Sequence, residues 1–165
     1  MTAALAEAAA QAEALAADGD ERALSQLRAQ WDEELDAAAR SSDFRERAVA
    51  FRAIGQFHFR QKTELLRRGL DDDSPAVRGS AIVSLERLSR DHTGVINEFR
   101  PLLHRIVDGD PVEAVRRLAI VALRNGPSRS DTVQLLTSLG QNDEESRELR
   151  DAATKVAQAL KKKAG

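Results

Sequence analysis

The sequence predicts an all-α fold, a right-handed α-solenoid of about four helix pairs with an N-terminal capping helix. Strong helix formers dominate the 165 residues, and no stretch shows the strict alternation of a β-strand. A short pattern that begins with an arginine also occurs four times, at intervals of 31, 38 and 34 residues. Self-similarity at such a period is typical of stacked helical repeats.

The repeated pattern is clearest in residues 71–88, where an acidic turn leads into an amphipathic helix. Ser74 suits the N-cap of this helix and Pro75 suits its first turn. Offsets of 3, 7 and 10 from the arginine lie on one helical face, so we expect those positions to be buried. An alanine at offset 3 would let two helices approach closely. The four arginines are Arg47, Arg78, Arg116 and Arg150; offset 3 holds Ala50, Ala81, Ala119 and Ala153; offset 7 holds Ile54, Leu85, Leu123 and Ala157; offset 10 holds Phe57, Leu88, Gly126 and Leu160.

An acid precedes three of these arginines by six residues. The acids are Asp72, Asp110 and Glu144. The planar guanidinium of arginine binds a carboxylate with two hydrogen bonds. We therefore expect each acid to contact a repeat arginine, within its own repeat or in a neighbouring one. The arginines expected in these contacts are Arg78, Arg116 and Arg150.

Residues 1–40 are expected to cap the repeats. Residues 3–17 hold ten alanines and predict a thin helix, and residues 21–39 predict a second helix with one apolar stripe and an acidic side. The end of a stack of repeats must be covered, so capping is favoured over self-association through these helices. Trp31, the only tryptophan, is interpreted as a packing anchor.

Residues 41–165 are expected to form the repeats. Gly and Pro clusters and short acidic turns separate the predicted helices. Pro101 falls inside one of them, where a kink or a restart is expected. The predicted helices span residues 43–60, 61–69, 74–90, 94–107, 111–125, 130–139 and 143–163.

Three segments carry a resemblance to a known family. They are LLRRGLDDDSPAVRGSAIVSL (65–85), LLHRIVDGDPVEAVRRLAIVAL (102–123) and LLTSLGQNDEESRELRDAATKVA (135–157). The chain resembles the HEAT-repeat family over residues 43–160, in particular the short HEAT-like repeats named after phycobilin lyases. The resemblance implies a helical solenoid, in a family that includes scaffolds, adaptors and a few enzymes. The first repeat departs from the pattern, with Ser41 and Glu46 where the others have an acid and an apolar residue.

Composition excludes several kinds of site. The chain has no cysteine, which removes disulfides and thiolate metal sites and favours a cytoplasmic location. No secretory signal and no run of 18 apolar residues is present, so no membrane association is expected. His58, His92 and His104 are scattered, and no phosphate-binding or nucleophile motif occurs. We therefore expect no metal, no cofactor and no catalytic residue. The excess of arginine over lysine suggests a bacterial source.

The favoured function is a non-enzymatic scaffold or adaptor that binds another protein or peptide. Offset 5 from the arginine points away from the buried arc of each repeat helix, so its side chains should lie exposed on the concave face. The alternative is that Val83 and Val121 pack against a neighbouring helix because the curvature is tight. Exposed apolar residues at equivalent places in stacked repeats form strips that often mark partner sites. The expected site residues are Arg52, Val83, Val121 and Lys155 at offset 5, Arg124 at offset 8 and Phe59 at offset 12, provided the helix continues that far.

Two other functions stay open at this point. Residues 40–68 hold eight basic and three acidic side chains interleaved with Phe44, Phe51, Phe57 and Phe59, which suggests a nucleic-acid binder. Phe44, Phe51 and Phe57 are, however, expected on the buried arc of the predicted helix. The side chains at offsets 5 and 8 from the repeat arginines are also not all basic. They would not form a continuous row of cations along a phosphate backbone, so binding to duplex DNA is not expected. The family resemblance also admits an accessory lyase-type enzyme. A monomer is expected, with self-association through the N-terminal helices as the alternative.

Overall fold

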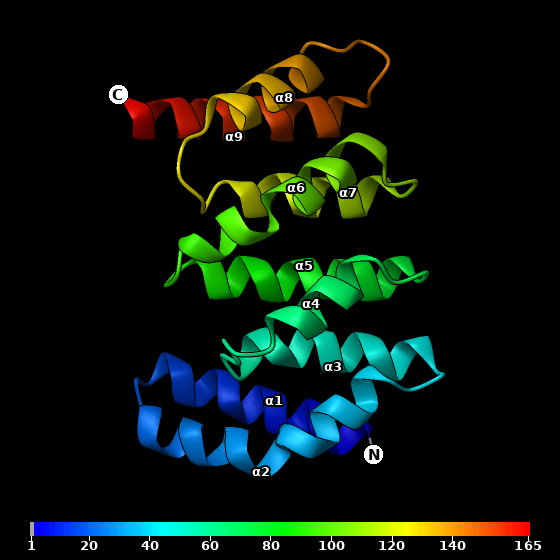
Figure 1. The fold of residues 1–165 in the computed structure, drawn as a ribbon, viewed down its shortest axis with the longest axis vertical. Coiled ribbons are helices and arrows are strands. Elements are labelled where there is room, and N and C mark those ends of the chain that lie inside the picture. The colour runs from blue at the N-terminus through cyan, green and yellow to red at the C-terminus, as the bar shows by residue number, and fades with distance from the viewer. Residues whose placement is uncertain (1) are drawn as a thin grey trace. The chain divides into compact units, whose positions relative to one another are not determined.

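The structure is a computed structural model that describes residues 2–165. In that range it contains nine α-helices and no strand, and the chain divides into two compact units at Leu88–Ser89 (Figure 1). None of the helices described is long and apolar enough to cross a membrane. The helices are α1 (Thr2–Ala17), α2 (Glu21–Ala39), α3 (Phe44–Gln56), α4 (Thr63–Leu70), α5 (Pro75–Ser89), α6 (Gly94–Gly109), α7 (Glu113–Leu123), α8 (Ser130–Gly140) and α9 (Arg147–Ala164).

The first unit holds α1 to α5, and its first three helices pack against one another. Helix α2 begins and ends where the sequence predicts, with the Asp20 side chain accepting from Ala23 N–H at its start. The turn before it contains Gly19 in the left-handed region at φ 73°, which glycine adopts without steric cost. The predicted boundary at residue 40 falls at the C-cap of α2.

Close helix approach in the first unit depends on small residues. A Cβ added to Gly69 of α4 would lie 2.6 Å from the Phe51 ring and 2.9 Å from the Ala81 Cβ. At Gly55 of α3, an added Cβ would lie 2.8 Å from the Cα of Ser84 in α5. The buried Ser84 hydroxyl accepts from Gly55 N–H at 2.9 Å and donates to the Phe51 carbonyl. One side chain of α5 thus satisfies backbone groups of α3.

Helix α3 ends four residues earlier than predicted. Its C-terminus forms a Schellman motif, in which Phe59 N–H donates to Ile54 O and His58 N–H donates to Gly55 O. His58 occupies the left-handed position of the motif at φ 58°. The motif turns Phe59 back into the core, where its ring centroid lies 5.5 Å from that of Phe57.

The second unit holds α6 to α9. Helix α6 packs against α7, α8 packs against α9, and the second helices of these pairs, α7 and α9, are also in contact. Helix α6 runs without a break through Pro101, so the expected restart does not occur. Lys163 of α9 donates to the carbonyls of Arg124 and Gly126 at 2.5 and 2.9 Å. This ammonium therefore binds carbonyls beyond the C-terminal end of α7, where cations are favoured.

The predicted buried face of the repeat is confirmed. The alanines at offset 3 are fully buried in all four repeats, and the residues at offsets 7 and 10 are buried as well. The repeat arginines are half-buried, with their side chains directed to the turns described below. The pattern thus fixes which side of each helix faces the core.

Candidate protein-binding surfaces

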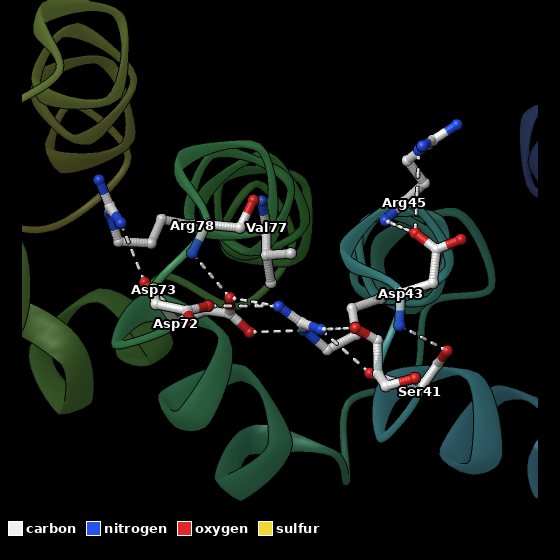
Figure 2. A network of polar contacts seen from close by, with 10 residues as sticks. Ser41, Asp43, Arg45, Asp72, Asp73, Val77 and Arg78 are labelled. Atoms are coloured by element: carbon white, nitrogen blue, oxygen red, sulfur yellow. Dashed lines mark hydrogen bonds and ion pairs between the residues drawn. The ribbon is translucent and has the colours of Figure 1, made fainter.

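Asp72 lies in the acidic turn before α5 (Figure 2). Arg47, in the first turn of α3, binds its carboxylate. Arg47 Nε donates to Asp72 Oδ2 and Nη2 donates to Oδ1, both at 3.0 Å. Arg47 Nη1 also donates to the Ser41 carbonyl, and Ser74 N–H donates to Asp72 Oδ1. Burial acts to raise the pKa of Asp72, but the hydrogen bonds from Arg47 and Ser74 outweigh it and hold this pKa below its ordinary value.

This pair confirms that Asp72 contacts a repeat arginine, although the arginine belongs to the preceding repeat. Arg78, which was expected in this contact, donates from Nη1 to the backbone carbonyl of Asp72 instead. The prediction for Glu144 is wrong, because that side chain is exposed and its N–H donates to Asn142 Oδ1.

The turn between α8 and α9 nevertheless contains acids that pair with repeat arginines, as predicted. Arg116 pairs with Glu145 at 2.6 Å, one residue beyond the predicted position, and Arg150 lies 3.5 Å from Asp143. Arg116 Nε also donates to the Val107 carbonyl. Asp110 accepts from Val112 N–H in its own turn. These contacts stabilise the turns between helices. They do not involve the side chains five residues after each repeat arginine.

In the first unit, the predicted binding residues differ in exposure. Arg52 is exposed and Val83 is half-buried. The prediction that Phe59 is exposed is wrong, because the Schellman motif places it in the core at 7% exposure. Lys62 Nζ lies 4.8 Å from the centroid of its ring. Phe59 is therefore a packing residue, and the surface that offset 5 supplies in this unit is mainly polar.

In the second unit, all three predicted residues are exposed. Val121 of α7 is 43% exposed, which makes it one of two large hydrophobic side chains on the surface of the described residues. Arg124 lies three residues further along the chain, at the C-cap of α7, and Lys155 takes the place of Val121 on α9. Because α7 and α9 are in contact, these residues belong to neighbouring faces of one compact unit.

The structure also contains an apolar pocket that was not predicted from the sequence. It has a volume of about 330 Å³ and lies among α1, α2 and α3 of the first unit. Trp31 lines it and is half-buried. The other lining residues are Ala4, Leu5, Glu34, Ala37, Ala38 and Glu46.

The basic stretch of residues 40–68 offers less to a nucleic acid than its composition suggests. Arg47 is bound to Asp72, and Lys62 donates to Asp32 and Asp36 of α2. Of the phenylalanines in this stretch only Phe44 is exposed, at 44%, contrary to the expectation that it faces the core. Phe44 opens the first turn of α3, where the packed face of the helix has not yet begun. Among the described residues there is no cluster of three His, Asp or Glu side chains able to hold a metal ion.

Comparison with known proteins identifies the family. A family model for HEAT repeats matches residues 32–124, which is more than half of the chain. Comparisons with curated proteins and with solved structures gave no match. The all-helical structure and the repeat match together confirm the predicted α-solenoid class. The chain belongs to the HEAT repeat family.

Proposed function

We propose that this protein is a non-enzymatic, cytosolic protein-binding module that holds an acidic amphipathic segment of its partner on α7 and α9. HEAT repeats are commonly protein-interaction scaffolds, and this supports a binding role. The observation that carries the proposal is the exposure of Val121 among unpaired basic side chains.

The exposed side of α7 is both apolar and cationic. Arg117 and Val121 stand at positions i and i+4 of α7, Arg124 follows at i+7 as the C-cap residue of that helix, and all three are exposed. Lys155 adds a further cation from α9 at the position equivalent to Val121. Within the described part of the chain, none of these three basic side chains forms an ion pair, so their charges are available to a partner.

The chemistry of this surface selects the class of partner. Burial of an exposed valine by a partner side chain contributes free energy in proportion to the apolar area removed from water. Surrounding cations favour a segment that carries carboxylates, and they speed its association at low ionic strength. An amphipathic helix with acidic flanks presents both features at helical spacing. In the first unit, Arg52 offers a further cation at the same repeat position, while the half-buried Val83 offers less apolar surface.

Site-specific crosslinking tests this proposal. The chain has no cysteine, so Val121→Cys creates one attachment point for a photoreactive benzophenone. Gln134→Cys supplies a matched control, because Gln134 is exposed on α8 of the same unit. In extract of the native host, the label at position 121 should crosslink to an acidic, amphipathic segment that the label at 134 does not reach. Crosslinking of the same proteins from both positions would overturn the proposal.

A further inference from the structure

The pocket among α1, α2 and α3 results from small residues placed around one large one. Leu5 of α1 closes its base and is 1% exposed. Ala4, Ala37 and Ala38 line its walls, and they reach too short a distance to fill the space beside Trp31. The result is a hollow of about 330 Å³ at the surface of this unit, beside the indole of Trp31.

The charges at the pocket are acidic and uncompensated. Glu34 and Glu46 line it, and no basic side chain does. Other acids of the same helix are neutralised, since Asp32 and Asp36 both accept from Lys62 Nζ. Glu34 forms no ion pair within residues 2–165, and Glu46 accepts only a neutral hydroxyl hydrogen bond, from Ser41. The pocket thus combines an aromatic face, an apolar floor and two carboxylates.

We propose that this pocket binds a lysine or arginine side chain carried by a basic segment of a partner protein. Tryptophan is the best aromatic partner for a cation, and a carboxylate adds charge-assisted hydrogen bonds to the same group. The long apolar stem of a lysine or arginine would contact Leu5 and the alanines, while its charged end reaches Glu34 and Glu46. This site is separate from the surface of α7 and α9 and does not depend on the function proposed there.

A peptide segment suits this pocket because exposed alanines border it. Ala4 and Ala37 are both exposed, so a peptide backbone can approach the mouth of the pocket closely. The surrounding residues 1–39 carry nine acids and two bases, which favours a segment with several basic residues over a single neutral one. Charge complementarity therefore selects a basic partner here, opposite in sign to the partner proposed for the second unit.

The single tryptophan provides the test. The chain has one Trp and no Tyr, so emission at 295 nm excitation reports on Trp31 alone. The probes are two blocked pentapeptides, acetyl-Gly-Leu-Arg-Leu-Gly-amide and the same peptide with Gln in place of Arg. The arginine peptide should change the emission saturably in low-salt buffer, and the glutamine peptide should bind at least about tenfold more weakly.

The variant Glu34→Gln/Glu46→Gln should weaken binding of the arginine peptide by about tenfold or more. The isosteric amide at position 46 keeps an oxygen acceptor for Ser41, so the fold is retained, and circular dichroism checks this. The control Glu144→Gln/Glu148→Gln removes two exposed charges in the second unit and should leave the affinity unchanged. Equal binding of both peptides, or equal binding by the two double variants, would overturn the proposal. A change of Trp31 emission with protein concentration alone, abolished by Lys161→Gln/Lys162→Gln, would assign the pocket to a second copy of the chain and also overturn it.

Discussion

Arg47 and Asp72 form a two-point hydrogen-bonded pair between consecutive repeats, with both donor–acceptor distances at 3.0 Å. Their side chains are only 16% and 13% exposed. Asp72 also accepts from Ser74 N–H at the start of α5, so a single carboxylate joins the beginning of α3 to the beginning of α5. This contact therefore links two consecutive repeats of the first unit through two hydrogen bonds.

Asp72→Asn should therefore lower the melting temperature, and the loss should depend on pH. The pKa of Asp72 lies below its value of about 3.9 in an unfolded chain. Its contribution to the unfolding free energy is complete above that value and is lost as the pH falls through the folded-state pKa. Wild type should melt several degrees above Asp72→Asn at pH 7, and the difference should shrink below about pH 4.

Asp73→Asn is the matched control for this measurement. Asp73 also contacts Arg47, at 3.3 Å, but its side chain is 95% exposed. Exposed ion pairs contribute little, so this variant should melt close to wild type at every pH. Equal losses for Asp72→Asn and Asp73→Asn would show that the buried pair has no special role.

A second pH dependence is expected in the second unit. Burial lowers the pKa of His104, Asp131 opposes this effect, and Arg100 and Arg129 reinforce it. His104 Nε2 lies 2.8 Å from the buried Thr132 hydroxyl. A lowered folded-state pKa means that stability is present above the unfolded value of about 6.5 and is lost as the pH falls. Thermal melts of wild type should lose more between pH 7 and pH 5 than melts of His104→Gln, whereas parallel losses would contradict this assignment.

Most of the fold follows from local sequence signals. The alanine-rich helix, the cap residues and the apolar stripes predicted all nine helices of the described residues, with α2 matching at both ends. The end of α3 was missed because His58, a residue without glycine's freedom, occupies the left-handed position of its C-terminal motif. The prediction that Phe59 is exposed was wrong for the same reason, because it assumed that α3 continues through residue 59.

The candidate sites were harder to predict from the sequence than the helices. Helical phase predicted the exposure of Val121, but it did not predict that Val83, at the same phase, is half-buried. The Trp31 pocket could not be predicted, because its hollow depends on how three helices come together. The one signal for it was the row of alanines in positions facing a large indole. The shift from Glu144 to Glu145 depends on the turn at Asn142, which repeat spacing alone does not specify.

The close approach of α3 and α5 should make Gly55 intolerant of substitution. In Gly55→Ala the new Cβ would meet backbone at Ser84 and would disturb the hydrogen bond from Gly55 N–H. Overpacking of this kind costs about 1–3 kcal/mol. Gly109→Ala is the control, because no atom lies within 4 Å of an added Cβ at that helix end. Urea unfolding should show a loss for Gly55→Ala and no loss for Gly109→Ala; equal midpoints would contradict the packing described.

The two valines at offset 5 should respond differently to a charge. Val121→Glu places a carboxylate on an exposed surface, so its melting temperature should stay within a few degrees of wild type. Val83→Glu buries part of a charged group, because Val83 is half-buried, and should melt lower. Differential scanning calorimetry of both variants distinguishes surface from core. A large drop for Val121→Glu would identify this valine as a core residue.

The affinity of the crosslinked partner segment for charge-reversed variants tests the proposed function most directly. Arg124→Glu/Lys155→Glu reverses two cations beside Val121, and Arg60→Glu/Arg105→Glu reverses two exposed cations elsewhere with the same change in net charge. Isothermal titration at low salt should show at least about a tenfold weaker Kd for the first variant and a Kd near wild type for the second. Equal affinities of the two variants would contradict a binding surface on α7 and α9.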